Sequence, residues 1–343
     1  MKSIITCCLL WCVSWTCQAT RLDDIRPHTP TSNTWSEQWF YYLNDPNVGY
    51  FKISAQTYLT PDLEPQAEHA YVHVVYAPVG GQQVVFDQYF DQVVLEGQQG
   101  SEAFRFSVPG KVDIDQDGIR LNLENLAFDL KYTGAHRHYT GGANPGQNPF
   151  GLIGDLPGVE VDYFVYSMGT PSQYHFTFGD VTHAGQGVTY LDKGWFDAKK
   201  SEGFAFVGAF TPKRQLMLTG GSQGGLPLEI WVGRYLSEGA DILFRPSLVG
   251  LSVQKESNAC NGYLKLTVTK FGKKIEVEAS SDLTDFYISE MPSKVVFGQE
   301  QPIMKSMNAR ITAKVYRWGR LVDTMDVPQG LLEFSGSEMC LQP

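Results

Sequence analysis

The chain consists largely of short segments in which apolar and polar residues alternate, separated by clusters of glycine, proline and asparagine. A period of two places successive side chains on opposite faces of a β-strand, so these segments are candidate strands. We expect strands at residues 39–42, 50–59, 69–79, 82–90, 104–108, 119–123, 174–178, 228–236, 263–269, 273–279, 311–318 and 321–327. No segment of the first half keeps a helical period. The pattern therefore predicts an all-β, antiparallel fold of two barrels or sandwiches.

The length and charge of the chain limit its organisation and its partners. At 343 residues it is long for one hydrophobic core, so we expect two domains of about 150 residues each. The formal net charge of −10 argues against binding to nucleic acid or to an anionic membrane surface. Aromatic residues make up 13% of the chain, which suits strands that line a hydrophobic cavity and equally suits an ordinary β-core.

The first nineteen residues, 1–19, have the organisation of a secretory signal peptide. Lys2 supplies the positive start, residues 4–13 form a short apolar core, and Ala19 is a small residue at the expected cleavage site. The apolar run is too short to span a bilayer and no later segment is long enough, so we expect no transmembrane segment. We therefore expect a secreted or periplasmic protein, with residues 20–35 as a polar arm on its surface.

Cysteine usage agrees with export. The sequence has six cysteines, of which four lie within the expected signal peptide, so Cys260 and Cys340 are left in the mature chain. Two cysteines in an exported chain favour one disulfide, and two separate buried thiols are the alternative. No group of cysteine and histidine residues has the spacing of a zinc site, so we expect no metal ion.

The residues that most suggest chemistry lie between Tyr190 and Trp195, where an acid, a cation and two aromatic side chains fall close together. A strand here would place Asp192 on the same face as Tyr190 and on the face opposite to Lys193. An aspartate that shares a face with aromatic side chains is partly desolvated, which raises its pKa and lets it act as an acid. The alternative is a surface Asp–Lys pair at a strand end, which is common and contributes little to stability.

The segment from Gly187 to Met217 resembles the signature of the lipocalin-like family that includes the bacterial carotenoid 1,2-hydratases (hydroxyneurosporene synthases). That family carries a pattern close to G-x-x-W-L-D-[RH]-x-W, then G-W-x-W, then a strand that ends near Leu-Met. The matching residues are Gly187, Leu191, Asp192, Trp195, Gly203-Phe204-Ala205-Phe206 and Leu216-Met217, with Tyr190 and Lys193 replacing a tryptophan and the basic residue. Residues 161–167 and 37–42 resemble two further strands of the family. Tocopherol cyclases and fungal pericyclase (Diels–Alderase) proteins are similar.

The resemblance implies two lipocalin-like β domains, which we place at residues 20–170 and 171–343, with the strand at Tyr190–Trp195 opening the second. It implies that Asp192 is the catalytic acid and that the site needs no cofactor. If the Asp192 carboxylate is charged, an arginine such as Arg234 or Arg245 is its expected partner. The substrate-binding residues expected beside it are Tyr190, Trp195, Phe204, Phe206, Tyr166, Ser167 and His175.

Two functions from different classes follow and stay open. In the first, the protein transforms a lipophilic polyene- or polyketide-like substrate by hydration, cyclisation or isomerisation in a pocket between two β-barrels, as a hydro-lyase, cyclase or isomerase. In the second, it is a secreted or periplasmic carrier that binds a small lipophilic molecule without changing it. Asp192 favours the enzyme, whereas Gly194, which stands where the hydratases tend to carry a second acid, favours the carrier.

Three other motif matches predict no site. Residues 113–124 match the ligand positions of an EF-hand, but Pro109-Gly110 stands where a helix is needed, so we expect a hairpin turning at 115–118. Residues 220–224 match the nucleophile elbow of serine hydrolases, but no histidine follows His183, so we expect a glycine-rich hairpin loop. The pair His136 and His138 has no third metal ligand at useful spacing, so we expect two solvated histidines.

Overall fold

A computed structural model describes residues 25–64, 66–98, 101–140, 149–151, 162–196, 201–223, 229–246, 251–289 and 302–340. The expected signal peptide lies outside these residues. The strands are β1 (Trp35–Asp45), β2 (Gly49–Leu59), β3 (His69–Pro78), β4 (Val84–Phe90), β5 (Val94–Gly97), β6 (Phe104–Val108), β7 (Val112–Asp115), β8 (Gly118–Leu123), β9 (Leu126–Tyr132), β10 (Tyr163–Phe178), β11 (Val181–Phe196), β12 (Ser201–Phe210), β13 (Arg214–Gln223), β14 (Glu229–Ser237), β15 (Asp241–Phe244), β16 (Leu251–Asn258), β17 (Tyr263–Lys270), β18 (Lys273–Ser280), β19 (Tyr287–Ser289), β20 (Ile303–Ser306), β21 (Arg310–Arg317), β22 (Arg320–Val327) and β23 (Leu331–Gly336). The predicted all-β, antiparallel fold is confirmed. None of the described helices is long and apolar enough to cross a membrane.

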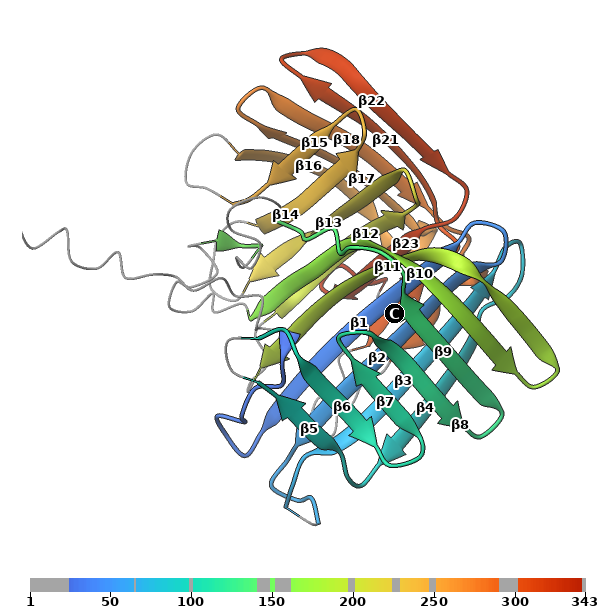
Figure 1. Cartoon of the computed structure of the whole chain (residues 1–343). Helices are drawn as coiled ribbons and strands as arrows, with labels where there is room; N and C mark the ends of the chain where they lie inside the picture. The colour runs from blue at the N-terminus through green and yellow to red at the C-terminus, as the bar shows by residue number, and fades with distance from the viewer. Residues whose placement is uncertain are drawn as a thin grey trace, which may run out of the picture.

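The first eleven strands form one antiparallel sheet in the order β4-β3-β2-β1-β11-β10-β9-β8-β7-β6-β5. The sheet curls until its two halves face each other, as its blue-to-green ribbon shows in Figure 1. The ring of Trp39 on β1 lies 6.3 Å from that of Phe104 on β6, and Phe51 on β2 lies 4.9 Å from Phe176 on β10. The curl encloses an apolar and aromatic core, because each strand turns one face inward.

The remaining strands form a seven-stranded sheet, β15-β14-β13-β12-β23-β20-β19, and a five-stranded sheet, β16-β17-β18-β21-β22. The two sheets pack around a second core, to which Trp231 of β14 and Val277 of β18 both belong. In Figure 1 the five-stranded sheet, orange to red, lies on the side of the seven-stranded sheet that is away from the first sheet. The seven-stranded sheet is therefore the middle layer of the molecule.

A third hydrophobic cluster joins the outer face of the first sheet to the seven-stranded sheet. It packs Tyr42 and Tyr50 of the first sheet against Phe206 and Leu331 of the second. Because of this additional layer, β1, β2 and β3 are buried along nearly their whole length on both faces. We call the space between these two sheets the intersheet layer.

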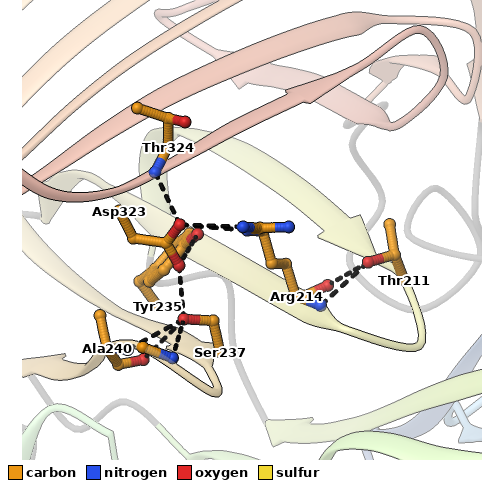
Figure 2. Close-up of polar contacts among 8 residues, drawn as sticks. Thr211, Arg214, Tyr235, Ser237, Ala240, Asp323 and Thr324 are labelled. Atoms are coloured by element: carbon orange, nitrogen blue, oxygen red, sulfur yellow. Dashed lines mark hydrogen bonds and ion pairs between the residues drawn. The ribbon is translucent and has the colours of Figure 1, made fainter.

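Asp323 of β22 ties the five-stranded sheet to the seven-stranded sheet (Figure 2). Its carboxylate accepts hydrogen bonds from the Ser237 hydroxyl at 2.5 Å, the Tyr235 hydroxyl at 3.0 Å and Nη2 of Arg214 at 3.0 Å. Burial by itself raises the pKa of Asp323, but these hydrogen bonds and that of the Thr324 backbone N–H outweigh it and lower the pKa to about 2.

The predicted disulfide is confirmed. Cys260 is bonded to Cys340, with the two Cα atoms 4.7 Å apart, and the bridge joins residues 80 positions apart in the sequence. A closed loop of this length contributes about 4 kcal/mol in the chain-entropy model. The bridge ties the end of the chain, after β23 of the middle layer, to the segment that connects β16 and β17 of the five-stranded sheet.

The structure corrects the expected division into domains. The boundary between residues 170 and 171 falls inside β10, which spans Tyr163–Phe178. The segment Tyr190–Trp195 belongs to β11, which pairs with β1 and β10 of the first sheet and so closes the first unit instead of opening the second. The chain passes to the second sheet between Phe196 and Ser201. Strand pairing decides this boundary, and a motif match carries no information on pairing partners.

The hairpin expected within residues 113–124 is confirmed. Asp115 ends β7, Gly118 begins β8, and Asp115 Oδ1 accepts hydrogen bonds from the backbone N–H groups of Asp117 and Gly118. This is the aspartate turn that the residue types indicate.

The prediction of a glycine-rich loop at residues 220–224 is wrong for the first residues of that range. Gly220 and Gly221 lie inside β13 and pair with both β12 and β14. A Cβ atom on Gly221 would lie 2.2 Å from the carbonyl oxygen of Gly203. The glycines are therefore needed for close approach of neighbouring strands and not for a turn.

Two segments expected at the surface are partly buried. In the N-terminal arm, Ile25 is 1% exposed, and its carbonyl accepts a hydrogen bond of 2.7 Å from the Trp39 indole. Of the two histidines expected in solvent, Nδ1 of His136 lies 2.7 Å from Oγ1 of Thr170, and Nδ1 of His138 lies 3.1 Å from a backbone carbonyl oxygen. Burial lowers the pKa of His136 to about 4.

Candidate functional site

Strand β11 separates the acid from the cation as the alternation predicts. Tyr190 faces the intersheet layer, and the Tyr190 hydroxyl donates a hydrogen bond of 2.9 Å to Asp192, so both side chains lie on that face. Lys193 points to the opposite face, into the interior of the first sheet, where its Nζ lies 4.6 Å from the Trp39 ring. There it forms a fully buried ion pair of 2.7 Å with Glu37. The alternative of a surface Asp–Lys pair is therefore wrong.

The Asp192 carboxyl is buried among hydroxyl donors. It is 4% exposed, and its Oδ2 accepts hydrogen bonds from the Tyr163 hydroxyl at 2.5 Å and from the Tyr190 hydroxyl at 2.9 Å. Its Oδ1 is buried and has no hydrogen-bond partner among the described residues. Burial raises the pKa of Asp192 to about 7, although the two tyrosines oppose this shift. Near neutral pH the protonated form is therefore well populated, with Oδ1 as its unpartnered oxygen.

Direct cross-strand partners place the site along two facing rows of side chains. In an antiparallel sheet, residues directly opposite each other point to the same face. The first row runs across the first sheet through Asp192, Phe40, Ser54, His73 and Asp87. The second row runs across the seven-stranded sheet through Thr219, Phe206, Glu333, Lys305 and Tyr287.

The two rows meet side chain to side chain across the intersheet layer. Nζ of Lys305 lies 5.7 Å from the ring of Phe40, and the rings of His73 and Tyr287 are 5.8 Å apart. Near the Asp192 end, the Tyr190 ring lies 6.3 Å from the Phe206 ring. The two rows therefore run in the same direction, so that polar groups from both sheets share one line. The line is buried at Asp192 and His73 and reaches solvent at Asp87, whose side chain is 46% exposed.

Two buried lysines lie in the middle of this line. Nζ of Lys305 is 3.0 Å from Oε2 of Glu333, and the Tyr42 hydroxyl donates to Oε1 of Glu333 at 2.9 Å. Lys52, the cross-strand partner of Tyr42, is 1% exposed and has no carboxylate within salt-bridge distance in the described ranges. Burial, and then the charge of Lys305, lowers the pKa of Lys52 well below its usual range. The site thus holds one ion pair and a second buried lysine, which is harder to protonate than a lysine in water.

The structure brings some of the expected site residues together. Phe206 belongs to the cluster around Asp192, and Phe204 packs against that cluster from the same strand, β12. With Tyr190, they form the aromatic side of the site.

Other expected site residues lie elsewhere. Trp195 packs on the inner face of β11, where its ring stacks on His28 at 4.2 Å. Tyr166 lies in the core of the first sheet, and Ser167 is bonded to Thr170 at 2.8 Å beside a break in the β10 register. His175 is exposed on the outer face of β10. Neither expected arginine is bonded to Asp192, and Arg234 pairs with Asp241 at 2.7 Å.

No family model and no curated protein matches this chain, but several solved structures do. A protein assigned as AttH from Nitrosomonas europaea is 12% identical, with a TM-score of 0.51, over 92% of this chain and 95% of that one. CghA is 11% identical, with a TM-score of 0.58, over 92% and 94% of the two chains. Kievitone hydratase from Nectria haematococca is 12% identical, with a TM-score of 0.51, over 93% of each chain. The chain has the fold of these proteins. The likeness covers both halves, so it includes the two sheets that carry the facing rows.

Several residues of the site were missed in the sequence. They are Tyr42, Lys52, His73, Tyr163, Tyr287, Lys305 and Glu333. Lys52 illustrates the reason, because it alternates with the apolar Phe51 and Ile53, a pattern that normally marks the solvated face of a strand. Only the packing of a second sheet on that face reveals that it is buried. Among the described residues there is also no group of three or more histidine, cysteine, aspartate or glutamate side chains placed to hold a metal ion.

Proposed function

We propose that the protein catalyses a cofactor-free hydration, cyclisation or isomerisation of a lipophilic polyene- or polyketide-like molecule bound in the intersheet layer. The observation that carries this proposal is the Asp192 carboxyl, which is buried, has an unpartnered Oδ1 and has its pKa raised to about 7. A general acid works best when its pKa lies near the working pH. The fold supports the substrate class, because it is shared with an enzyme named as a hydratase of kievitone and with CghA, which was crystallised with Sch210972.

In the proposed step, protonated Asp192 gives its proton to a carbon of an alkene or to a carbonyl oxygen of the substrate. The carboxylate that forms keeps its hydrogen bonds from Tyr163 and Tyr190 and is attracted by the charge of Lys305. The ring faces of Tyr190 and Phe206 stabilise the cation left on the substrate. Water, or a second double bond of the same molecule, then adds to this cation. The proton released in that addition, or in loss from a neighbouring carbon, returns to Asp192, so the cycle balances without a cofactor.

The alternative is a carrier that binds the same kind of molecule and leaves it unchanged. It is favoured by Gly194, where the space beside the carbonyl of Asp162 holds no second acid. For either function we propose a secreted or periplasmic location, which the disulfide supports because such bonds persist in oxidising compartments.

One experiment separates the two functions. Lipophilic molecules are extracted from the purified wild-type protein, identified by mass spectrometry, and returned to wild-type, Asp192→Asn and Asp180→Asn protein. Asp180, exposed in the turn between β10 and β11, is the matched control. The enzyme hypothesis expects conversion by the wild type and by Asp180→Asn, and binding without conversion by Asp192→Asn. Binding without conversion by all three supports the carrier, and failure of all three to bind any lipophile contradicts both functions.

A further inference from the structure

The end of the first row that lies away from Asp192 carries a second group of polar side chains, in which His73 is buried and Asp87 is 46% exposed. Nδ1 of His73 lies 2.7 Å from Oδ1 of Asp87, and the Tyr71 hydroxyl is hydrogen-bonded to the same oxygen. Asp87 remains a carboxylate, because these hydrogen bonds outweigh the effect of its burial and lower its pKa. A carboxylate accepts and does not donate, so His73 must carry its proton on Nδ1. The lone pair of the imidazole is therefore on Nε2.

The Nε2 atom of His73 faces the intersheet layer without a partner. It is buried and accepts no hydrogen bond from any described residue, and the His73 side chain is only 3% exposed. The hydroxyl of Tyr287, whose ring lies 5.8 Å from that of His73, is likewise buried and unpartnered in the described part of the chain. Buried polar atoms are rarely left unpaired, because each costs about 1–3 kcal/mol. Two of them, contributed by both sheets at one point, indicate a place for a ligand's polar group.

The charges around His73 keep its ring neutral. Burial, followed by the positive charge of Lys52, lowers the pKa of His73 to about 4, although Asp87 opposes this and Lys305 adds to it. Among the described residues, Tyr71 on β3 and Tyr287 on β19 also lie beside the ring, and burial raises the pKa of both hydroxyls well above the usual range. At neutral pH, Nε2 is therefore an acceptor and the Tyr287 hydroxyl is available as a donor. A hydroxyl group, which is donor and acceptor at once, fits both.

The register gives the distance between this group and Asp192. Asp192, Phe40, Ser54 and His73 are consecutive partners on four neighbouring strands. Strands lie about 4.8 Å apart, so three intervals separate the two Cα atoms by roughly 14 Å. This distance is too long for His73 to exchange a proton with the bond that Asp192 protonates. One elongated molecule that lies across the ring of Phe40 would instead reach both.

We propose that His73, held by Asp87, and Tyr287 form a hydroxyl-binding subsite, so that the ligand is an elongated lipophilic alcohol or phenol with its hydroxyl about 10–14 Å from the group facing Asp192. The hydroxyl donates to Nε2 of His73 and accepts from the hydroxyl of Tyr287. His73 is then a specificity-determining residue that does not take part in the chemical step. This inference rests on the proposed function, because it requires a lipophilic ligand in the intersheet layer.

The test compares two probes: farnesol, an acyclic isoprenoid alcohol, and its methyl ether, in which a methyl group replaces the hydroxyl proton. Their affinities are measured by quenching of the protein's intrinsic fluorescence for the wild type, His73→Phe, Tyr287→Phe and the control His175→Phe, whose histidine is exposed. We expect wild type and His175→Phe to prefer farnesol about tenfold, since the ether leaves Nε2 unpaired. The preference should fall below twofold in His73→Phe. In Tyr287→Phe both affinities should fall, because the ether oxygen also accepts.

A second measurement does not depend on any variant. In ¹⁵N spectra of the wild-type protein, the Nε2 resonance of His73 should have the shift of an unprotonated nitrogen, and farnesol but not the ether should move it. Equal affinity for the two probes in the wild type, or an undiminished preference in His73→Phe, overturns the subsite while leaving the proposed function standing. Failure of the wild type to bind either probe, together with an extract free of lipophiles, removes the proposed function and this inference with it.

Discussion

At the scale of single residues, the two buried carboxyl groups of the intersheet layer show how a neighbouring cation decides protonation. Glu333 has Nζ of Lys305 at 3.0 Å, and although burial raises its pKa, Lys305 and Lys52 outweigh that effect and the pKa is lowered. Asp192 has only hydroxyl donors within hydrogen-bond distance, and its pKa is raised to about 7. Of these two buried groups, Glu333 is therefore a permanent carboxylate and Asp192 is a carboxyl that can carry a proton near neutral pH.

The raised pKa of Asp192 predicts a specific dependence of stability on pH. A carboxyl whose pKa is about 7 when folded and 3.8 otherwise stabilises the protein fully below pH 4, and this contribution is lost as the pH rises through 7. We expect Asp192→Asn to be more stable than the wild type at pH 8 by about 2–4 kcal/mol, and no more stable at pH 4. Urea unfolding at the two pH values checks this. An advantage of equal size at both would contradict the assigned pKa.

The buried Lys193–Glu37 pair gives a second prediction at this scale. Both side chains are fully buried, with 2.7 Å between Nζ and Oε1. Removing Lys193 leaves the buried Glu37 carboxylate with only the backbone N–H and the imidazole of His28 as partners among the described residues. We therefore expect Lys193→Met to lower the free energy of unfolding by up to about 3–5 kcal/mol. The double variant Lys193→Met/Glu37→Gln should regain part of this loss. If urea unfolding shows the double variant to be less stable than the single one, the pair is not the source of the effect.

At the scale of strands, close approach of neighbouring backbones explains which glycines matter. A Cβ on Gly221 of β13 would lie 2.2 Å from the carbonyl oxygen of Gly203 and 2.8 Å from the Cα of Phe204. A Cβ on Gly194 of β11 meets only the carbonyl oxygen of Asp162, at 3.6 Å, which is an ordinary contact. Adding a Cβ atom is therefore costly at Gly221 and not at Gly194, although both glycines lie within strands.

This contrast predicts opposite outcomes for two alanine substitutions. We expect Gly221→Ala to lower the free energy of unfolding by about 2 kcal/mol or more, because backbone atoms of β12 must move. Gly194→Ala should change it by less than about 0.5 kcal/mol. Thermal or urea unfolding of both proteins checks the pair, and similar stability of the two variants would show that β12 and β13 tolerate the added methyl group.

The sequence predicted what depends on alternation and missed what depends on a second sheet. Opposite faces for Asp192 and Lys193 follow from the period of a strand, and so do the bounds, to within two residues, of ten of the 23 described strands. The burial of Lys52 and His73 could not be predicted, because a polar residue in an alternating strand ordinarily faces water. The boundary inside β10 was missed for a related reason, since pairing partners lie far apart along the chain.

At the scale of the whole molecule, the layers are joined by a small number of polar contacts in addition to their cores. Asp323 is the clearest, since one carboxylate of the five-stranded sheet receives donors from β13 and β14 of the middle layer (Figure 2). The side chain of Arg214 is 40% exposed, so solvent screens part of its interaction with Asp323.

The lowered pKa of Asp323 predicts sensitivity to acid. Because its pKa is about 2 when folded and 3.8 otherwise, its contribution is fully present above pH 4 and is lost as the pH falls through 2. We expect Asp323→Asn to be about 1 kcal/mol less stable than the wild type at pH 6, with the gap closing toward pH 2. Asp326→Asn, on the same strand in an exposed pair with Arg310, is the control. A gap that is constant from pH 6 to pH 2 would contradict the prediction.

The burial of β1, β2 and β3 on both faces has a consequence for the order in which the protein is made. The first sheet uses only residues 35–196, so all of it leaves the ribosome before the seven-stranded sheet exists. Until then, the face that carries Tyr42 and Tyr50 is open to water and to other nascent chains. Lys52 and His73 lie on that face. While the face is exposed to solvent the lysine is charged, and its charge opposes association between incomplete chains. When the second half docks, burial lowers the pKa of Lys52, so docking favours the loss of its proton. Docking of the second half on the first sheet should therefore be slower at acidic pH.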